Sequence, residues 1–301
     1  MNLRTAALLG LLALGTALLP LLGSPYVIGV AFNLMMWIAL VQSWSMLSAT
    51  TGYVSLGHVA FVGIGAYVFV LSMDFLPLPL GLGLAALSAG FFALVIGLPV
   101  LRVRGPYFVI LTFGLSELVR NIVLRIESAL GSFGRMIFDA PDPGVLLWWM
   151  LALAIAATVV AHKIRDARLG RGLAALREDE VAAETVGVAV ARLKLIAWVA
   201  SAVIPGAVGA LLLLRTGYFE PGQAFDPIIS FSIVTMALVG GTEDARGPIL
   251  GAAAFVLLSE LLWSNLPQLY MIVLGVSLIV FILFLPRGLI GLFGRARRAA
   301  R

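Results

Sequence analysis

Residues 163–194 read KIRDARLGRGLAALREDEVAAETVGVAVARLK, and this charged segment stands between two long apolar runs. Charged side chains are costly inside a hydrocarbon layer, so the segment must lie in water beside a membrane. On a helix from about Gly172 to Val188, spacings of three, four and three place four residues on one stripe: Arg177, Glu180, Glu184 and Gly187. The other sides are mainly Ala and Val, including Ala182 and Ala183. Such a helix suits docking into a groove on a soluble partner, and the alternative is a solvated loop without a dedicated partner.

The composition on either side of this segment is that of a membrane protein. Hydrophobic residues make up 61% of the 301 residues, charged residues make up 12%, and the mean hydropathy is +1.09. A soluble domain of this size does not need so much apolar surface. The apolar runs are roughly twenty residues long, which favours helices over the strands of a β-barrel. The sequence therefore predicts an all-α, polytopic transmembrane bundle.

We expect about ten helices in one transmembrane domain spanning residues 1–301, with residues 163–194 as a loop within it. The first run, residues 5–22, has no cleavage site after it and is expected to be retained. The other helices are expected near residues 26–48, 50–73, 78–100, 106–123, 145–162, 195–214, 249–263 and 268–285, with a further one from residue 228 that is interrupted at Gly240 and Gly241.

Basic residues give an independent check on the topology. With the N-terminus inside, about 16 of the 20 Lys and Arg residues fall on the cytoplasmic side, as the positive-inside rule requires. Both termini and residues 163–194 are then cytoplasmic. The pI of 10.0 reflects these loops, so nucleic acid is not an expected partner. The absence of Cys excludes disulfides, thiolate metal sites and cysteine nucleophiles.

Residues 50–73 form a Gly-rich run that carries Ser55 and His58. Gly permits a break in the helix, and lipid cannot satisfy hydrogen-bonding groups, so this segment belongs inside the protein. For His58 two roles stay open: an interhelical hydrogen bond that fixes packing, or a place on a translocation pathway.

Charged residues also fall within the expected membrane-spanning helices. Glu117, Arg120 and Asn121 share one helix face, with Glu117 near mid-bilayer, and Glu260 lies in a later helix. An unpaired carboxylate there is costly. Glu117 and Arg120 are therefore either a structural pair that locks helices together or groups that line a path. Ser55, Asn121 and Glu260 are further candidates for the same translocation pathway.

Several motifs resemble one family of transporters. SLGHVAFVGIGAY, residues 55–67, is similar almost residue for residue to the SLGHxAFxGIGAY of branched-chain amino-acid permeases of the LivH/LivM family. GRGLAALREDEVAAETVGV, residues 170–188, resembles their coupling loop, although Val181 stands where the usual Glu-Ala-Ala pattern begins. VGGTEDARGP, residues 239–248, and the closing FLPRGL, residues 284–289, are also similar. In contrast, ALGSFGRMIFDAPDPG, residues 129–144, departs from the Thr-Gly-Gly-rich loop of that family.

The resemblance implies a non-catalytic membrane subunit of an ATP-driven importer for branched-chain amino acids or similar small solutes, in the bacterial inner membrane. It implies four kinds of partner besides lipid: two ABC ATPase subunits, a second, LivH-like permease, and a periplasmic solute-binding protein. ATP-Mg would bind the ATPases, since this chain has no Gly-rich phosphate loop, and no cofactor or metal is expected here. The expected coupling residues are Arg177, Glu180, Ala182, Ala183, Glu184 and Gly187. The alternatives are a stand-alone secondary transporter or channel and, more remotely, an intramembrane enzyme.

Overall fold

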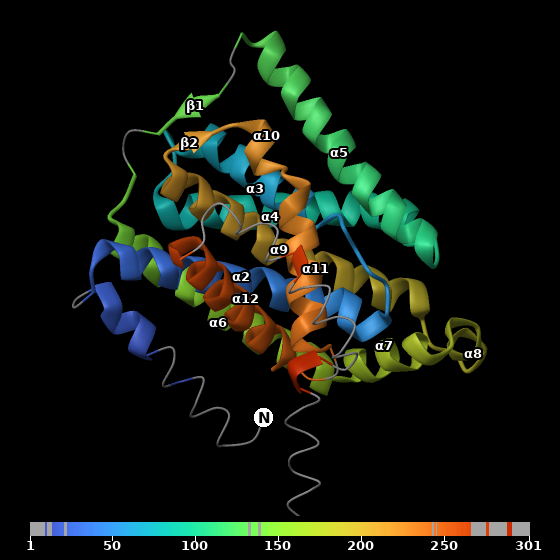
Figure 1. The fold of residues 1–301 in the computed structure, drawn as a ribbon. Coiled ribbons are helices and arrows are strands. Elements are labelled where there is room, and N and C mark those ends of the chain that lie inside the picture. The colour runs from blue at the N-terminus through green and yellow to red at the C-terminus, as the bar shows by residue number, and fades with distance from the viewer. Residues whose placement is uncertain are drawn as a thin grey trace, which may run out of the picture.

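A bundle of helices makes up almost all of the computed structural model, which describes residues 10, 14–20, 23–131, 134–137, 140–242, 244, 246–265, 275–276 and 288–290 (Figure 1). The longer helices are α2 (Pro25–Thr51), α3 (His58–Ser72), α4 (Leu78–Val100), α5 (Pro106–Ala129), α6 (Pro143–Asp166), α9 (Val190–Thr216), α11 (Pro227–Gly240) and α12 (Gly247–Asn265). The shorter elements are α7 (Arg168–Glu178), α8 (Glu180–Thr185), α10 (Pro221–Ala224) and the strands β1 (Arg135–Met136) and β2 (Tyr218–Phe219). The all-α transmembrane prediction is confirmed.

The described part contains six helical segments long and apolar enough to cross a membrane, whereas about ten crossings were expected. One of the six joins α10 and α11, as Pro221–Gly240. Residues 58–72 form a helix of only 15 residues, which at 1.5 Å per residue falls short of a bilayer about 30 Å thick. The helix expected at residues 268–285, and most of the one at 5–22, lie outside the described residues.

Helix α9 occupies the centre of the bundle, between α2, α3 and α4. Small residues permit this close packing, as is usual between helices in a membrane. A Cβ placed on Gly65 of α3 would lie 2.1 Å from the carbonyl oxygen of Gly206, and one on Gly209 would lie 2.0 Å from that of Val62. The backbones of α3 and α9 therefore touch directly, and their spacing leaves no room for a side chain at these points.

The Gly-rich run after α2 breaks the helix, which its glycines permit, and the helix expected at residues 50–73 covers only residues 58–72. Gly52 ends α2 with φ +79°, and α3 begins only at His58. Buried non-helical backbone needs partners within the protein. Three are provided: Trp44 Nε1 donates to the Ser55 carbonyl at 2.9 Å, Leu56 N donates to Thr112 Oγ1 at 3.1 Å, and Val59 N donates to Ser230 Oγ at 3.1 Å.

A two-stranded antiparallel sheet, β1 with β2, was not predicted. Arg135 pairs with Phe219 and Met136 with Tyr218, at the end of the bundle opposite α7 and α8 (Figure 1). The ion pair between Arg135 Nη2 and Glu127 Oε1, 2.9 Å long, ties β1 to the end of α5. Residues 125–144 thus begin with the last turn of α5 and include a strand.

Candidate functional site

The charged segment folds as two short helices, α7 and α8, and the single helix expected from Gly172 to Val188 is wrong. Asp179 interrupts it with extended backbone, and its Oδ1 accepts from Val181 N at 2.9 Å and from Ala182 N at 3.0 Å. An Asp side chain that caps a new helix competes with continuation of the preceding one. The predicted stripe is therefore divided between two helices.

Glu180 points into the protein as the centre of a group that we call the ion cluster: Tyr53, Arg104, Glu180 and Lys194. Lys194 Nζ donates to Glu180 Oε1 at 2.8 Å, Tyr53 OH donates to Glu180 Oε2 at 2.5 Å, and Arg104 Nη2 lies 3.1 Å from Glu180 Oε1. The Lys194 side chain is only 4% exposed and that of Glu180 is 12% exposed. Lys194 Nζ also donates to the Tyr53 hydroxyl and to the Leu101 carbonyl, each at 3.3 Å.

The electrostatics of the ion cluster favour a charged Glu180. Burial acts to raise the pKa of Glu180, but the hydrogen bonds from Lys194 and Tyr53 and the positive charges of Lys194 and Arg104 outweigh it, so its pKa lies below the ordinary value. Burial, together with the adjacent Glu180 carboxylate, raises the pKa of Tyr53, which stays protonated as a donor. The cluster therefore holds a fixed arrangement of charge at neutral pH.

Two further contacts seat α7 and α8 against the bundle. Arg177 Nη1 donates to the carbonyl of Ala49 in the last turn of α2, at 2.9 Å, where a cation is favourable. Ala183 is buried against Leu176 and Val190. Helix α7 is thus attached to α2 at the point where the broken segment begins, and α8 packs on α7 and on the start of α9.

The outer surface of α8 remains uncovered. Ala182, Glu184 and Gly187 are exposed, as are the apolar side chains of Val181 (60%) and Val186 (79%). Of the six expected coupling residues, these three face outward, Glu180 and Ala183 face inward, and Arg177 contacts α2. The sequence interpretation missed Tyr53, Arg104 and Lys194, although the position of Lys194 at the start of an apolar helix was a signal.

Aromatic rings connect Tyr53 of the ion cluster to His58 at the start of α3. Tyr53 meets Phe108 edge-on at 5.1 Å between ring centroids, Phe108 meets Trp198 at 6.0 Å, and Trp198 meets His58 at 6.4 Å. Rigid, packed rings transmit a displacement better than flexible side chains do. The ion cluster is therefore joined to the buried centre of the bundle by continuous ring contacts.

His58 and Ser55 are both fully buried. Neither ring nitrogen of His58 has a hydrogen-bond partner among the described residues, so the interhelical hydrogen bond that we considered is not seen there. The Ser55 side chain accepts from Gly57 N at 3.2 Å and helps shape the break.

The charged residues of α5 pair within one helix. Arg120 Nη1 lies 3.3 Å from Glu117 Oε2, each side chain is about one-third exposed, and Asn121 Nδ2 donates to the Glu117 carbonyl at 2.7 Å. The pair therefore does not join two helices, contrary to the structural alternative above. Glu260 lies apart on α12, where it accepts from the Tyr26 hydroxyl of α2.

The fold is that of a polytopic helical membrane protein with a charged element, α7 and α8, beside its spanning helices. The model of the family described as "Branched-chain amino acid transport system / permease component" matches residues 26–283, and the chain belongs to this family. It is similar to the "High-affinity branched-chain amino acid transport system permease protein LivM" of Escherichia coli strain K12, at 28% identity over 94% of this chain and 74% of the relative. The protein of the same name from Salmonella typhimurium strain LT2 is also 28% identical, over 87% of this chain and 69% of the relative. No solved structure gives a significant match.

Proposed function

We propose that this chain is a permease subunit of an ATP-driven importer of branched-chain or similar hydrophobic amino acids, and that α8 receives the motion of a separate ATPase. The observation that carries the proposal is the way α8 is held, which we call its seat. One face of α8 is fixed by the buried ion cluster, and the other presents exposed Val181, Ala182 and Val186. Exposed apolar side chains beside a fixed charged seat are typical of a docking surface. The family of the chain and the names of its relatives support the class of substrate.

The coupling mechanism follows from the contacts of this seat. Closure of the ATPase would push α8, and the push would pass through Glu180 to Tyr53 and Lys194. Tyr53 lies in the break between α2 and α3, whereas Lys194 lies near the start of α9. One displacement is thus delivered both to the broken segment and to the central helix, which together would rock between inward-open and outward-open states.

Helix α5 supplies the best candidate lining for the pathway. It is amphipathic, its polar side carries Glu117, Arg120 and Asn121, and many of its apolar side chains are exposed in this single chain. A partly exposed ion pair on a membrane-spanning helix must meet water or protein, because lipid does not solvate it. We therefore place α5 between an aqueous path and a second, LivH-like permease subunit. His58, Ser55 and Glu260 remain weaker pathway candidates.

The full assembly that we propose contains two ABC ATPases that bind ATP-Mg, the second permease and a periplasmic solute-binding protein, in a bacterial inner membrane. The termini, α7 and α8 would face the cytoplasm, and β1, β2 and α10 would face the periplasm. This chain would bind no cofactor and catalyse no reaction itself.

The test uses the complete complex in proteoliposomes, with leucine uptake and ATP hydrolysis as readouts. Ala182→Arg should lower substrate-stimulated hydrolysis and uptake at least tenfold, because a long charged side chain obstructs the α8 surface. Ala174→Arg, on the exposed side of α7, is the matched control and should change neither. Wild-type rates in Ala182→Arg would disprove the docking role, and leucine uptake by this chain alone under an ion gradient would indicate a secondary transporter instead.

A further inference from the structure

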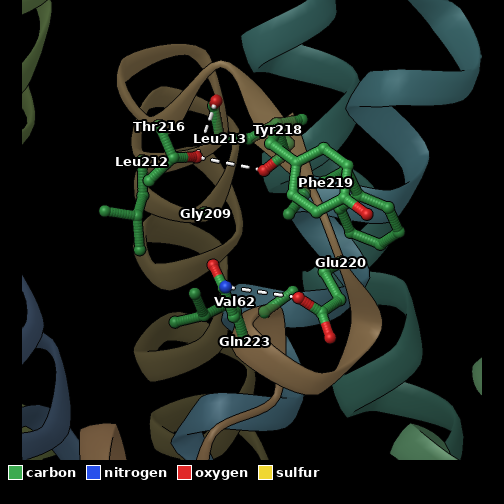
Figure 2. A pocket seen from close by; sticks show the side chains of 11 residues that line it. Val62, Gly209, Leu212, Leu213, Thr216, Tyr218, Phe219, Glu220 and Gln223 are labelled. Atoms are coloured by element: carbon green, nitrogen blue, oxygen red, sulfur yellow. Dashed lines mark hydrogen bonds between the residues drawn. The ribbon is translucent and has the colours of Figure 1, made fainter. Parts of the chain in front are cut away.

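A small pocket lies between α3, α9, β2 and α10 (Figure 2). In Figure 1, β2 and α10 are at the end of the bundle opposite α7 and α8. Its volume is about 180 Å³, and its walls include Val62, Leu212, Leu213 and Phe219. An apolar cavity of about 150 Å³ is enough for benzene, whereas drug-sized ligands occupy at least about 300 Å³. The pocket therefore fits the side chain of a hydrophobic amino acid rather than a larger solute.

The rim of the pocket carries one carboxylate. Glu220 and Gln223 lie at one end of the pocket in Figure 2, and Gln223 Nε2 donates to Glu220 Oε2 at 3.2 Å. Among the described residues, no Lys or Arg forms an ion pair with Glu220. A carboxylate without a cation at the mouth of an apolar pocket is complementary to an ammonium group.

A guanidinium lies close to the same rim. A Cβ placed on Gly222 would be 3.3 Å from Glu220 Oε1 and 4.0 Å from Arg120 Nη2. The anion and the cation thus both lie beside the position that a side chain at residue 222 would occupy, which we call the notch and which is next to the pocket at Glu220 rather than part of its lining. Arg120 Nε is buried and has no acceptor within the described part of the chain. A buried donor that lacks an acceptor is costly, and a carboxylate in the notch would satisfy it.

We propose that this pocket is an outer binding site for a zwitterionic hydrophobic amino acid on its way into the permease, which rests on the proposed function. The aliphatic side chain occupies the apolar pocket, Glu220 accepts hydrogen bonds from the ammonium group, and Arg120 donates to the carboxylate. Gly222 keeps the notch open between them. The site selects for a free ammonium group, a free carboxylate and a side chain of roughly four carbons.

The experiment labels the complete reconstituted complex with a diazirine analogue of leucine and maps the modified peptides. Labelling should fall on the segment spanning residues 209–224 and be competed by leucine, but not by 4-methylpentanoate, which lacks the ammonium group. Glu220→Gln should weaken labelling and raise the KM for leucine uptake about tenfold to a hundredfold, since a charge-assisted contact is lost. It should also reduce the difference between leucine and 4-methylpentanoate in how well each competes with labelling, which a merely structural role would not do.

Two further variants complete the design. Gly222→Val should fill the notch and abolish specific labelling. Asp74→Asn, which removes an exposed carboxylate from the loop after α3, is the matched control and should behave as wild type. Leucine transport by the wild type without labelling of residues 209–224, or unchanged labelling and competition in Glu220→Gln, would overturn the site alone. Failure of the wild-type complex to transport any hydrophobic amino acid would overturn the proposed function and the site together.

Discussion

Replacing Glu180 with Gln should release α8 from the bundle without removing its outer surface. The substitution keeps the shape of the side chain but leaves the ammonium of Lys194, only 4% exposed, without its carboxylate at 2.8 Å. Breaking a buried pair by removal of one partner costs about 3–5 kcal/mol. Because the Leu101 carbonyl and Tyr53 hydroxyl still accept from Lys194, we expect the lower end, about 3 kcal/mol, which corresponds to roughly 150-fold in the equilibrium for undocking α8.

Hydrogen exchange of the amides in residues 180–188 measures this equilibrium directly. In Glu180→Gln these amides should exchange faster by about two orders of magnitude, and coupled ATP hydrolysis in the full complex should fall with them. Glu184→Gln is the matched control, since its contact with Arg104 is 3.8 Å long and its side chain is 51% exposed. That contact is worth less than about 1 kcal/mol, so exchange should change less than about fivefold.

A double variant separates loss of charge from loss of shape. Glu180→Gln combined with Lys194→Met removes both buried charges and should recover much of the lost protection, because the uncompensated ammonium is gone. If Glu180→Gln exchanges no faster than Glu184→Gln, the ion cluster does not hold α8, and the coupling route through Tyr53 and Lys194 is wrong.

Other measurements test the seat, the packing and the pathway. The pKa of Glu180 is lowered from its ordinary value of 4.5, so its contribution to the docking of α8 should be complete above about pH 4.5. That contribution should be lost as pH falls through the lower, folded-state pKa. Limited proteolysis from pH 7 to pH 3 should therefore cleave α8 faster at low pH in the wild type, with no such pH dependence in Glu180→Gln. Gly65→Ala should destabilise the bundle by about 2–3 kcal/mol, measured by thermal unfolding in detergent, because the new Cβ would meet the Gly206 carbonyl at 2.1 Å. A Cβ on Gly83 would have nothing within 4 Å, so Gly83→Ala should cause no loss of stability. Equal loss of stability in Gly65→Ala and Gly83→Ala would refute the close contact of α3 with α9. Glu117→Gln should reduce uptake while changing unfolding by less than about 1 kcal/mol, because its ion pair is partly exposed; a large loss of stability with normal transport would make the pair structural.

Periodicity and composition predicted most of the fold, because long apolar runs bounded by Gly and Pro leave few choices. Helix α4 was expected at residues 78–100 and is found there. The Gly-rich run indicated that a break was possible near Gly52 but not that α3 would begin only at His58. The strands β1 and β2 were not predictable, since two residues each show no periodicity and their pairing spans more than eighty positions. The break at Asp179 was missed because its neighbours favour a helix, and only the capping geometry of its side chain ends α7.

The candidate site was likewise predicted only in part from the sequence. Glu180 was singled out as part of an outward stripe, and its true direction depends on Tyr53 and Lys194, which lie 127 and 14 positions away. Sequence patterns identify a charged surface but not which of its charges find buried partners from other helices. For the same reason, Glu220 was not recognised, because the pocket beside it forms only when α3, α9 and α10 meet.

Site-directed cross-linking at Val186 tests the central claim most directly. The chain contains no Cys, so Val186→Cys creates a single reactive thiol on a side chain that is 79% exposed. In the assembled complex this thiol should cross-link to an ATPase subunit, with a yield that changes between the ATP-bound and nucleotide-free states, and membrane-impermeant reagents added outside intact cells should not reach it. Labelling from outside, or cross-linking that never includes the ATPase, would contradict the account.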